Sequence, residues 1–298
     1  MKTTDFFKRM NAGTCLLVAV LLIGFTACNE DAITETDLLT DETESFEDEQ
    51  DTEEGLDDVS DVFDALFEAD AAEGGRIMSS DTLPPDSSYL CAVRIHNREE
   101  NTIIIDFGDG CVGLDGVLRS GKIIITYTEH YLIPGAIVTK TFEDYYVNDH
   151  QVEGFITLTN ISETAQSFPT FNLVLQDGKF TWDDGSFALR ETDFVWTWVN
   201  SNNPLYDEFH KDGTANGTTR RGVEYSVEIT STLIRKKICK LEGVHIPVQG
   251  IKSITREGLP NFTVDYGDGS CDNAVTITRE DGQSREVDNF RRYRRRRG

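Results

Sequence analysis

From Tyr89 onward, short runs rich in Ile, Val, Thr and aromatic residues alternate with turns that contain Gly and Asp. This pattern is typical of β-strands, and no alternation of strands with helices indicates a parallel fold. Asp-Gly pairs at 177–178, 184–185 and 281–282 predict tight hairpins. We therefore expect an all-β, antiparallel body over residues 89–290, arranged as a sandwich, a barrel or an elongated meander. The predicted strands are 101–107, 122–128, 137–147, 153–159, 171–176, 179–182, 187–199, 223–229 and 261–266.

The segment before the β body has the hydrophobic period of a helix instead of a strand. Apolar residues recur at helical spacing between residues 56 and 67, with acidic residues on the opposite face, and Gly74-Gly75 follows. These features predict one short amphipathic helix over 56–75. Two interpretations stay open: the helix docks its apolar stripe on the β body, or it stays free to bind a partner. The apolar positions are Leu56, Val59, Phe63, Leu66 and Phe67.

The N-terminus has the pattern of an export signal. Three basic residues precede the uncharged run Leu16–Phe25, which is too short to cross a bilayer and fits a signal-peptide core. The run ends in Phe-Thr-Ala-Cys28, which resembles the lipobox of bacterial lipoproteins. That resemblance implies cleavage before Cys28 and acylation of its thiol, with palmitate among the chains. The following Asn29-Glu30-Asp31 resembles the surface-export signal of Bacteroides-type lipoproteins.

The net charge of −25 is distributed unevenly. Residues 29–75 contain twenty acidic and no basic residues, whereas residues 291–298 contain six arginines. An acidic segment with few apolar residues is expected to stay unfolded, which predicts a flexible tether over 28–55. The arginine-rich tail is interpreted as a disordered end, with lipopolysaccharide phosphates or the tether as alternative contacts. The body has no basic excess, which argues against nucleic-acid binding.

A ten-residue string occurs twice in the body, as Thr102–Cys111 (TIIIDFGDGC) and Phe262–Cys271 (FTVDYGDGSC). A further cysteine precedes each copy, so we interpret the copies as two related modules. In an oxidising compartment these four cysteines are expected to form disulfides, and the repeat selects Cys91–Cys111 and Cys239–Cys271. A zinc site would require closely spaced cysteine pairs, which this chain lacks.

Other residues carry weaker chemical hypotheses. The repeated Asp-aromatic-Gly-Asp string would offer carboxylates to calcium, or simply build a turn. Three tryptophans in one region would stack on sugar rings if exposed, or pack in the core. Asp81-Thr82-Leu83 resembles the O-glycosylation acceptor of Bacteroides-type secreted proteins, which implies modification of Thr82. The calcium candidates are Asp106, Asp109, Asp265 and Asp268, and the glycan candidates are Trp182, Trp196 and Trp198.

No known catalytic or phosphate-binding motif is present, so no cofactor, metal or catalytic residue is expected. The repeated string and the segment Asp106–Thr159 resemble uncharacterised lipoproteins of Bacteroidota, over roughly residues 89–290. That resemblance implies a β-rich body and a lipid-anchored place at the outer membrane, facing the cell surface or the periplasm. The expected segments are a signal peptide (1–27), a tether (28–55), a helix (56–75), a linker (76–88), a body (89–290, with modules near 89–200 and 201–290) and a tail (291–298).

The leading functional hypothesis is a non-enzymatic binding module for a glycan or a protein. A glycan-acting hydrolase of the envelope and a structural envelope component are the alternatives. The membrane is the expected partner through the lipid anchor, and nucleic acid is not an expected partner.

Overall fold

The computed structural model describes residues 42–53, 55, 58, 59, 62, 91–113, 116–148 and 150–287. The expected signal peptide, Cys28, Thr82 and the arginine-rich tail lie outside these residues.

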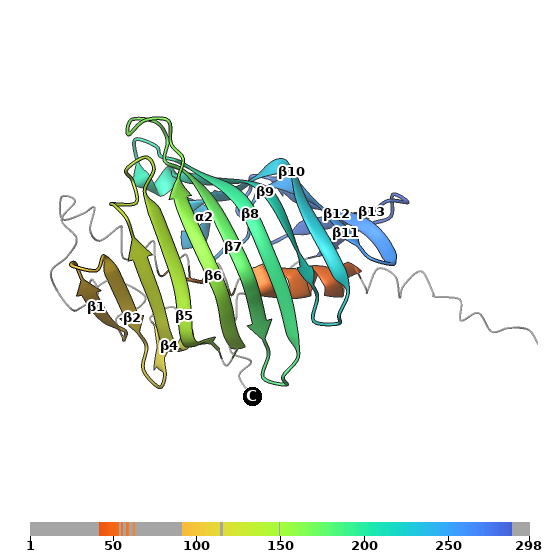
Figure 1. Ribbon diagram of the computed structural model, residues 1–298. Helices are drawn as coiled ribbons and strands as arrows, with labels where there is room; N and C mark the ends of the chain where they lie inside the picture. Colours follow the sequence, from red (N-terminus) through yellow and green to blue (C-terminus); the bar gives the residue numbers. More distant parts are fainter. Residues whose placement is uncertain are drawn as a thin grey trace, which may run out of the picture. The chain divides into compact units, whose positions relative to one another are not determined.

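The body is all-β, as the sequence predicts, and its strands form one large antiparallel sheet (Figure 1). The sheet is a meander in which strands follow one another in chain order from β1 to β14, except that the short β3 pairs only with β4. The strands are β1 (Val93–Asn97), β2 (Thr102–Asp106), β3 (Cys111–Val112), β4 (Leu118–Tyr127), β5 (Ile137–Val147), β6 (His150–Asn160), β7 (Thr170–Thr181), β8 (Phe187–Val199), β9 (Glu208–Thr218), β10 (Glu224–Lys236), β11 (Gln249–Arg256), β12 (Leu259–Asp268), β13 (Val275–Arg279) and β14 (Ser284–Val287).

Two short helices lie in connections between strands. A 3₁₀ helix, η1 (Pro204–Tyr206), connects β8 to β9, and α2 (Lys237–Leu241) follows β10. The side chain of Asn203 caps η1 by accepting a hydrogen bond from the Leu205 N–H. Neither helix is long enough to show a hydrophobic period, so the sequence does not predict them.

Alternate residues of each strand face opposite sides of the sheet. In β8, Ala188, Arg190 and Phe194 are buried, while the intervening Glu191 and Asp193 are exposed. We call the buried side the inner face. Register keeps inner residues together on neighbouring strands: Leu173 of β7, for example, lies directly opposite Phe194.

One predicted turn is instead part of a strand. Asp177 and Gly178 lie within β7, where the pairing register shifts between Leu175 and Gly178. Asp177 has a φ of 52°, and a Cβ on Gly178 would collide with the backbone oxygen of Arg190. An Asp-Gly pair also suits a β-bulge, because one residue must take positive φ and the other must allow close backbone approach. The pairs at 184–185 and 281–282 do form hairpin turns.

The structure corrects the boundary of the predicted tether. Residues 42–53 are helical, where the sequence predicts an unfolded chain up to residue 55. Residues 55, 58, 59 and 62 are helical too, and we call this segment, 42–62 as far as it is described, the N-terminal helix. It is drawn in orange in Figure 1 and lies against the inner face of the sheet.

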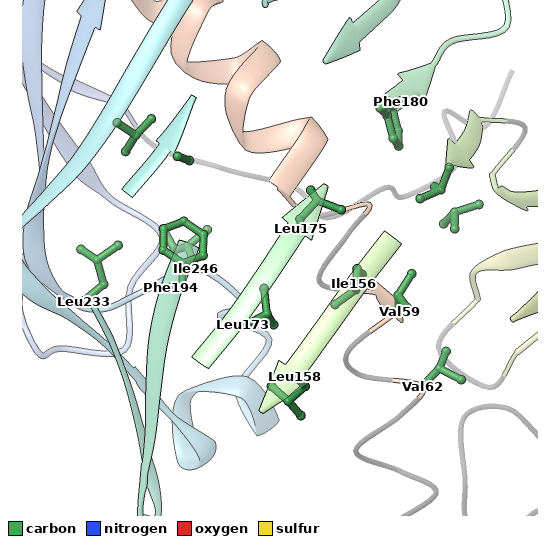
Figure 2. Close-up of a cluster of buried hydrophobic side chains, with 14 of the residues drawn as sticks. Val59, Val62, Ile156, Leu158, Leu173, Leu175, Phe180, Phe194, Leu233 and Ile246 are labelled. Atoms are coloured by element: carbon green, nitrogen blue, oxygen red, sulfur yellow. The ribbon is translucent and has the colours of Figure 1, made fainter. Parts of the chain in front are cut away.

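Apolar side chains of the sheet and helix form one core (Figure 2). Val59 and Val62 of the N-terminal helix pack in the cluster that contains Ile156 of β6 and Leu173 of β7. The helix therefore belongs to the same core as the strands. Of the five apolar positions predicted for the amphipathic helix, Val59 is described and docks on the body, as the first of the two interpretations expects. Leu56, Phe63, Leu66 and Phe67 lie outside the described residues.

Candidate binding face

The inner face of the sheet contains many buried basic side chains. Such residues are rarely fully buried unless an acidic group pairs with them. Among the described residues, eight lysines and arginines of the strands are less than 9% exposed. They come from strands across the whole sheet, from β1 to β13. They are Arg94, Arg119, Lys140, Arg190, Lys211, Lys252, Arg256 and Arg279.

The N-terminal helix supplies buried carboxylates to this face. Glu49 is the central one: its Oε1 accepts a hydrogen bond from Arg190 Nη1 at 2.8 Å, and its Oε2 accepts one from Lys252 Nζ at 2.5 Å. Arg190 and Lys252 come from β8 and β11, so one carboxylate joins two distant strands. All three side chains are 1% exposed.

Glu53 lies one helical turn further along and shares the same cations. Its carboxylate accepts hydrogen bonds from Lys211 of β9 and, at 3.5 Å, from Arg190 Nη2, and it lies 3.6 Å from Lys252 Nζ. Burial by itself raises the pKa of Glu53, but Lys211, Lys252 and Arg190 outweigh that effect and hold the pKa well below its usual value. Glu53 is therefore a permanent anion in a basic environment.

The same electrostatics act on the cations. Burial lowers the pKa of Lys252, but Glu49, Tyr266 and Glu53 together outweigh that effect, and the net pKa is raised. The ammonium also lies over two rings, 5.3 Å from the centroid of Phe46 and 5.7 Å from that of Tyr266. Lys252 is therefore fully charged although it is 1% exposed.

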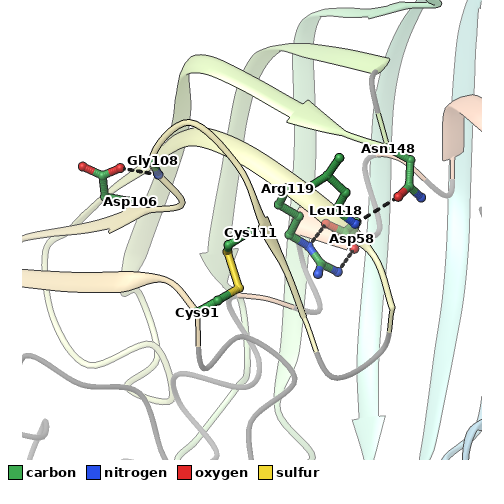
Figure 3. Close-up of a disulfide and its surroundings, with 8 residues drawn as sticks. All are labelled: Asp58, Cys91, Asp106, Gly108, Cys111, Leu118, Arg119 and Asn148. Carbon is green, nitrogen blue, oxygen red and sulfur yellow. Dashed lines mark hydrogen bonds and ion pairs between the residues drawn. A yellow bond between two sulfur atoms is a disulfide. The ribbon is translucent and has the colours of Figure 1, made fainter.

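Two further carboxylates pair at the ends of the described helix. At one end, Glu42 Oε1 accepts a hydrogen bond from Arg256 Nη2 of β11 at 3.0 Å. At the other end, Asp58 accepts from Arg119 of β4 through both oxygens, at 2.9 and 2.5 Å (Figure 3). The hydroxyl of Tyr145 also donates to Asp58, at 2.9 Å. The helix is thus held by ion pairs along its length, from β11 to β4.

Apolar contacts fix the position of the helix between these pairs. Phe46, Val59 and Val62 are at most 1% exposed. Gly55 lies so close to the ring of Phe180 in β7 that a Cβ on Gly55 would overlap the ring. The face therefore recognises a helix by shape as well as by charge.

Sequence reasoning missed the acidic residues of this interface. Glu42, Phe46, Glu49 and Glu53 follow one another at spacings of four, three and four residues, the period of one helix face. This helical period was not recognised because helices are predicted from the spacing of apolar residues, and three of these four residues are acidic. Repulsion among its carboxylates disfavours a helix in the isolated acidic segment, and in the folded chain the sheet cations offset that repulsion.

The disulfides are those that the repeat predicts. Cys91 is bonded to Cys111, and Cys239 of α2 is bonded to Cys271 after β12 (Figure 3 shows the first pair). Each disulfide joins connections near the ends of strands, and Cys111 of β3 lies directly opposite Arg119 of β4.

The repeated Asp residues build turns. Asp106 Oδ1 accepts a hydrogen bond from the Gly108 N–H at 2.8 Å, and Asp265 Oδ1 accepts from the Gly267 N–H at 2.9 Å. Asp268 does the same for Ser270. Asp109 is exposed in the first of these turns. Within the described part of the chain, no cluster of three or more His, Cys, Asp or Glu side chains is arranged to hold a metal ion.

The tryptophans are directed to the inner side of the sheet. Trp182 is 7% exposed, and the Arg220 guanidinium lies 4.8 Å from its ring centroid. The ring of Trp198 stacks on Phe209, and its Nε1 donates to Asp207. Trp196 lines a small pocket between β8, β9 and β10 together with Phe209, His210, Lys211, Leu233, Arg235 and Pro247. The rings of Trp182 and Trp198 already have protein neighbours, which does not favour stacking of these two on a sugar.

No helix among the described residues has the length and apolar character needed to span a bilayer. Comparisons with protein-family models, with curated proteins and with solved structures gave no match. The basic inner face and the acidic helix on it are thus the basis for assigning a role to this chain.

Proposed function

We propose that this chain is a non-enzymatic binding module of the bacterial cell envelope, anchored in the outer membrane through acylated Cys28. The sequence supports the anchor, since a signal-like core ends at that cysteine. The resemblance to Bacteroidota lipoproteins supports the same location. A lipid anchor would hold the sheet near the membrane on the N-terminal segment.

The observation that supports binding is the inner face itself. It holds a segment that is 141 residues distant from Arg190 and 203 residues distant from Lys252, through charge pairs and a few apolar contacts. Glu53, held as a permanent anion by three cations, suits charge recognition rather than proton transfer. A protein ligand is favoured over a glycan because the rings of Trp182 and Trp198 already contact protein side chains.

The anchor is tested by fractionation of cells that express the full chain. Cys28→Ala should move the protein from the membrane fraction to the soluble fraction and abolish labelling by a palmitate analogue. Cys15→Ala, immediately before the signal core, is the matched control and should change neither result. Retention of Cys28→Ala in the membrane would contradict lipidation.

Binding is tested on the same chain with a glycan array and with the envelope proteins of the host. A ligand of the inner face should respond to Lys211→Gln, which removes a cation that is 7% exposed. Lys179→Gln is the control, because Lys179 forms a surface pair with Glu153 and is 38% exposed. A ligand affected equally by both variants would not bind the inner face. Turnover of any glycan ligand would favour the hydrolase alternative.

A further inference from the structure

We propose that the inner face is a receptor for an acidic amphipathic helix of a protein partner, and that the N-terminal helix occupies this receptor within its own chain. This inference rests on the proposed binding function and names the class of ligand.

The two surfaces of this interface carry opposite charges. The strands provide the buried cations, and the helix provides four buried carboxylates: Glu42, Glu49, Glu53 and Asp58. Residues 42–62 contain eleven acidic and no basic residues. A helix rises 1.5 Å per residue, so the four carboxylates extend over about 24 Å. The face thus presents a series of cations to a ligand of one sign.

This interface differs from an ordinary core in what separation would expose. A helix held mainly by apolar contacts would leave a hydrophobic groove, which is costly in water. Here, separation would expose apolar residues of the shared core and, beside them, four carboxylates and the ammonium and guanidinium groups that pair with them, which water hydrates well. Apolar residues of similar volume often stabilise a core as well as buried ion pairs do. Charge pairs are better suited to selecting a partner.

The apolar contacts restrict the ligand to a helix. Phe46, Val59 and Val62 occupy fixed positions on the face, and Gly55 allows close approach to Phe180. A sulfated glycan would satisfy the cations but not these contacts. A matching partner helix would have carboxylates at positions i, i+7, i+11 and i+16, an aromatic residue at i+4 and a glycine at i+13, the spacings of the N-terminal helix.

The internal helix competes well against any partner helix because it belongs to the same chain as the sheet. A tethered ligand acts at an effective concentration of the order of millimolar. A partner helix should therefore bind weakly to the unaltered chain and more tightly when the internal helix is weakened. That competition is what the experiment measures.

The probe is a fluorescein-labelled peptide with the sequence of residues 42–62, titrated with the full chain and followed by fluorescence anisotropy. The test variant is Glu49→Gln/Glu53→Gln, which weakens the internal helix and leaves every sheet cation in place. The control is Glu47→Gln, which removes a carboxylate at an exposed position of the same helix. A second peptide, with Gln at positions 49 and 53, tests charge recognition.

We expect the test variant to bind the acidic peptide at least about tenfold more tightly than the unaltered chain and the control variant. The peptide with Gln at positions 49 and 53 should bind at least about tenfold more weakly. Equal affinity of the test variant and the unaltered chain would overturn the proposal. Equal binding of a polysulfated glycan of the same charge would show a general polyanion site and would also overturn it.

Circular dichroism shows whether the variant Glu49→Gln/Glu53→Gln still folds. If Glu49→Gln/Glu53→Gln loses the β-sheet spectrum, the N-terminal helix is an obligatory part of the core and the proposal is overturned. If the variant is folded and does not bind the peptide, this inference fails, while the membrane anchor and the Lys211→Gln binding test stand unaffected.

Discussion

The ammonium group of Lys252 lies 2.5 Å from a carboxylate oxygen of Glu49, although 203 residues separate the two along the chain. Both side chains are 1% exposed. A charge pair at this depth is hardly screened by solvent, and removal of one partner leaves the other charge buried. The pair therefore couples the N-terminal helix to the far part of the sheet.

The first prediction concerns this pair. Glu49→Gln or Lys252→Met alone should lower the free energy of unfolding by about 3–5 kcal/mol, because each removes one charge from a buried ion-pair network and leaves its partners less well compensated. The double variant should lose clearly less than the sum of the two single losses. Urea denaturation measures all four proteins. Lys122→Met, which breaks an exposed pair with Glu143, is the control and should cost only about 0–1 kcal/mol. Additive losses would contradict a direct pair.

The second prediction concerns the close approach of helix and sheet. Gly55→Ala should destabilise the fold, because its Cβ would overlap the ring of Phe180. A loss of stability would be informative, because alanine at a helix position is otherwise favoured over glycine by about 1 kcal/mol. Glu47→Ala, at an exposed position of the same helix, should be nearly neutral. Adding Phe180→Leu to Gly55→Ala should recover part of the loss. A stabilising Gly55→Ala would show that the helix does not contact Phe180.

The third prediction concerns pH. The pKa of Glu53 in the folded protein lies well below the usual 4.5, after its cations outweigh burial. Its ionised form therefore stabilises the fold above pH 4.5, and this contribution is lost as the pH falls through the lower folded pKa. Unfolding free energies of the unaltered chain and Glu53→Gln should differ most near pH 7 and converge in acid. A difference that grows below pH 4.5 would contradict the ion pairs.

The fourth prediction concerns the disulfides. The bonds Cys91–Cys111 and Cys239–Cys271 close loops with sequence separations of 20 and 32 residues. Loop entropy gives each a contribution of about 3–4 kcal/mol, so reduction should lower the denaturation midpoint markedly. Peptide mapping without reductant should recover these two links. Any peptide that joins Cys91 or Cys111 to Cys239 or Cys271 would contradict the structure.

The sequence predicts the sheet better than it predicts the binding face. The strands 137–147 and 187–199 are found with the same bounds in β5 and β8, because they are long and rich in β-branched and aromatic residues. β9 was missed because two glycines and several polar residues interrupt its apolar pattern. The cysteine pairs follow from the repeat, because both copies keep the pattern Asp-aromatic-Gly-Asp-Gly followed by a closing cysteine.

The interface was invisible for a physical reason. The cations that pair with the helix at residues 42–53 lie 130 or more residues away in the sequence. A short stretch of sequence therefore does not contain both partners of any of these ion pairs. Composition alone gives an acidic, unfolded tether there. Inward cations such as Lys252 also look like ordinary surface residues until the strand register places them on the buried face.

The most direct measurement is hydrogen exchange of the backbone amides in residues 42–53 of the full chain, followed by mass spectrometry. An acidic segment that is not bound to the sheet should exchange within seconds at neutral pH, as unfolded chains do. We predict strong protection in the unaltered chain, reduced in Arg190→Gln and unchanged in the surface variant Lys179→Gln. Complete exchange of residues 42–53 within seconds in the unaltered chain would contradict a helix bound to the basic inner face.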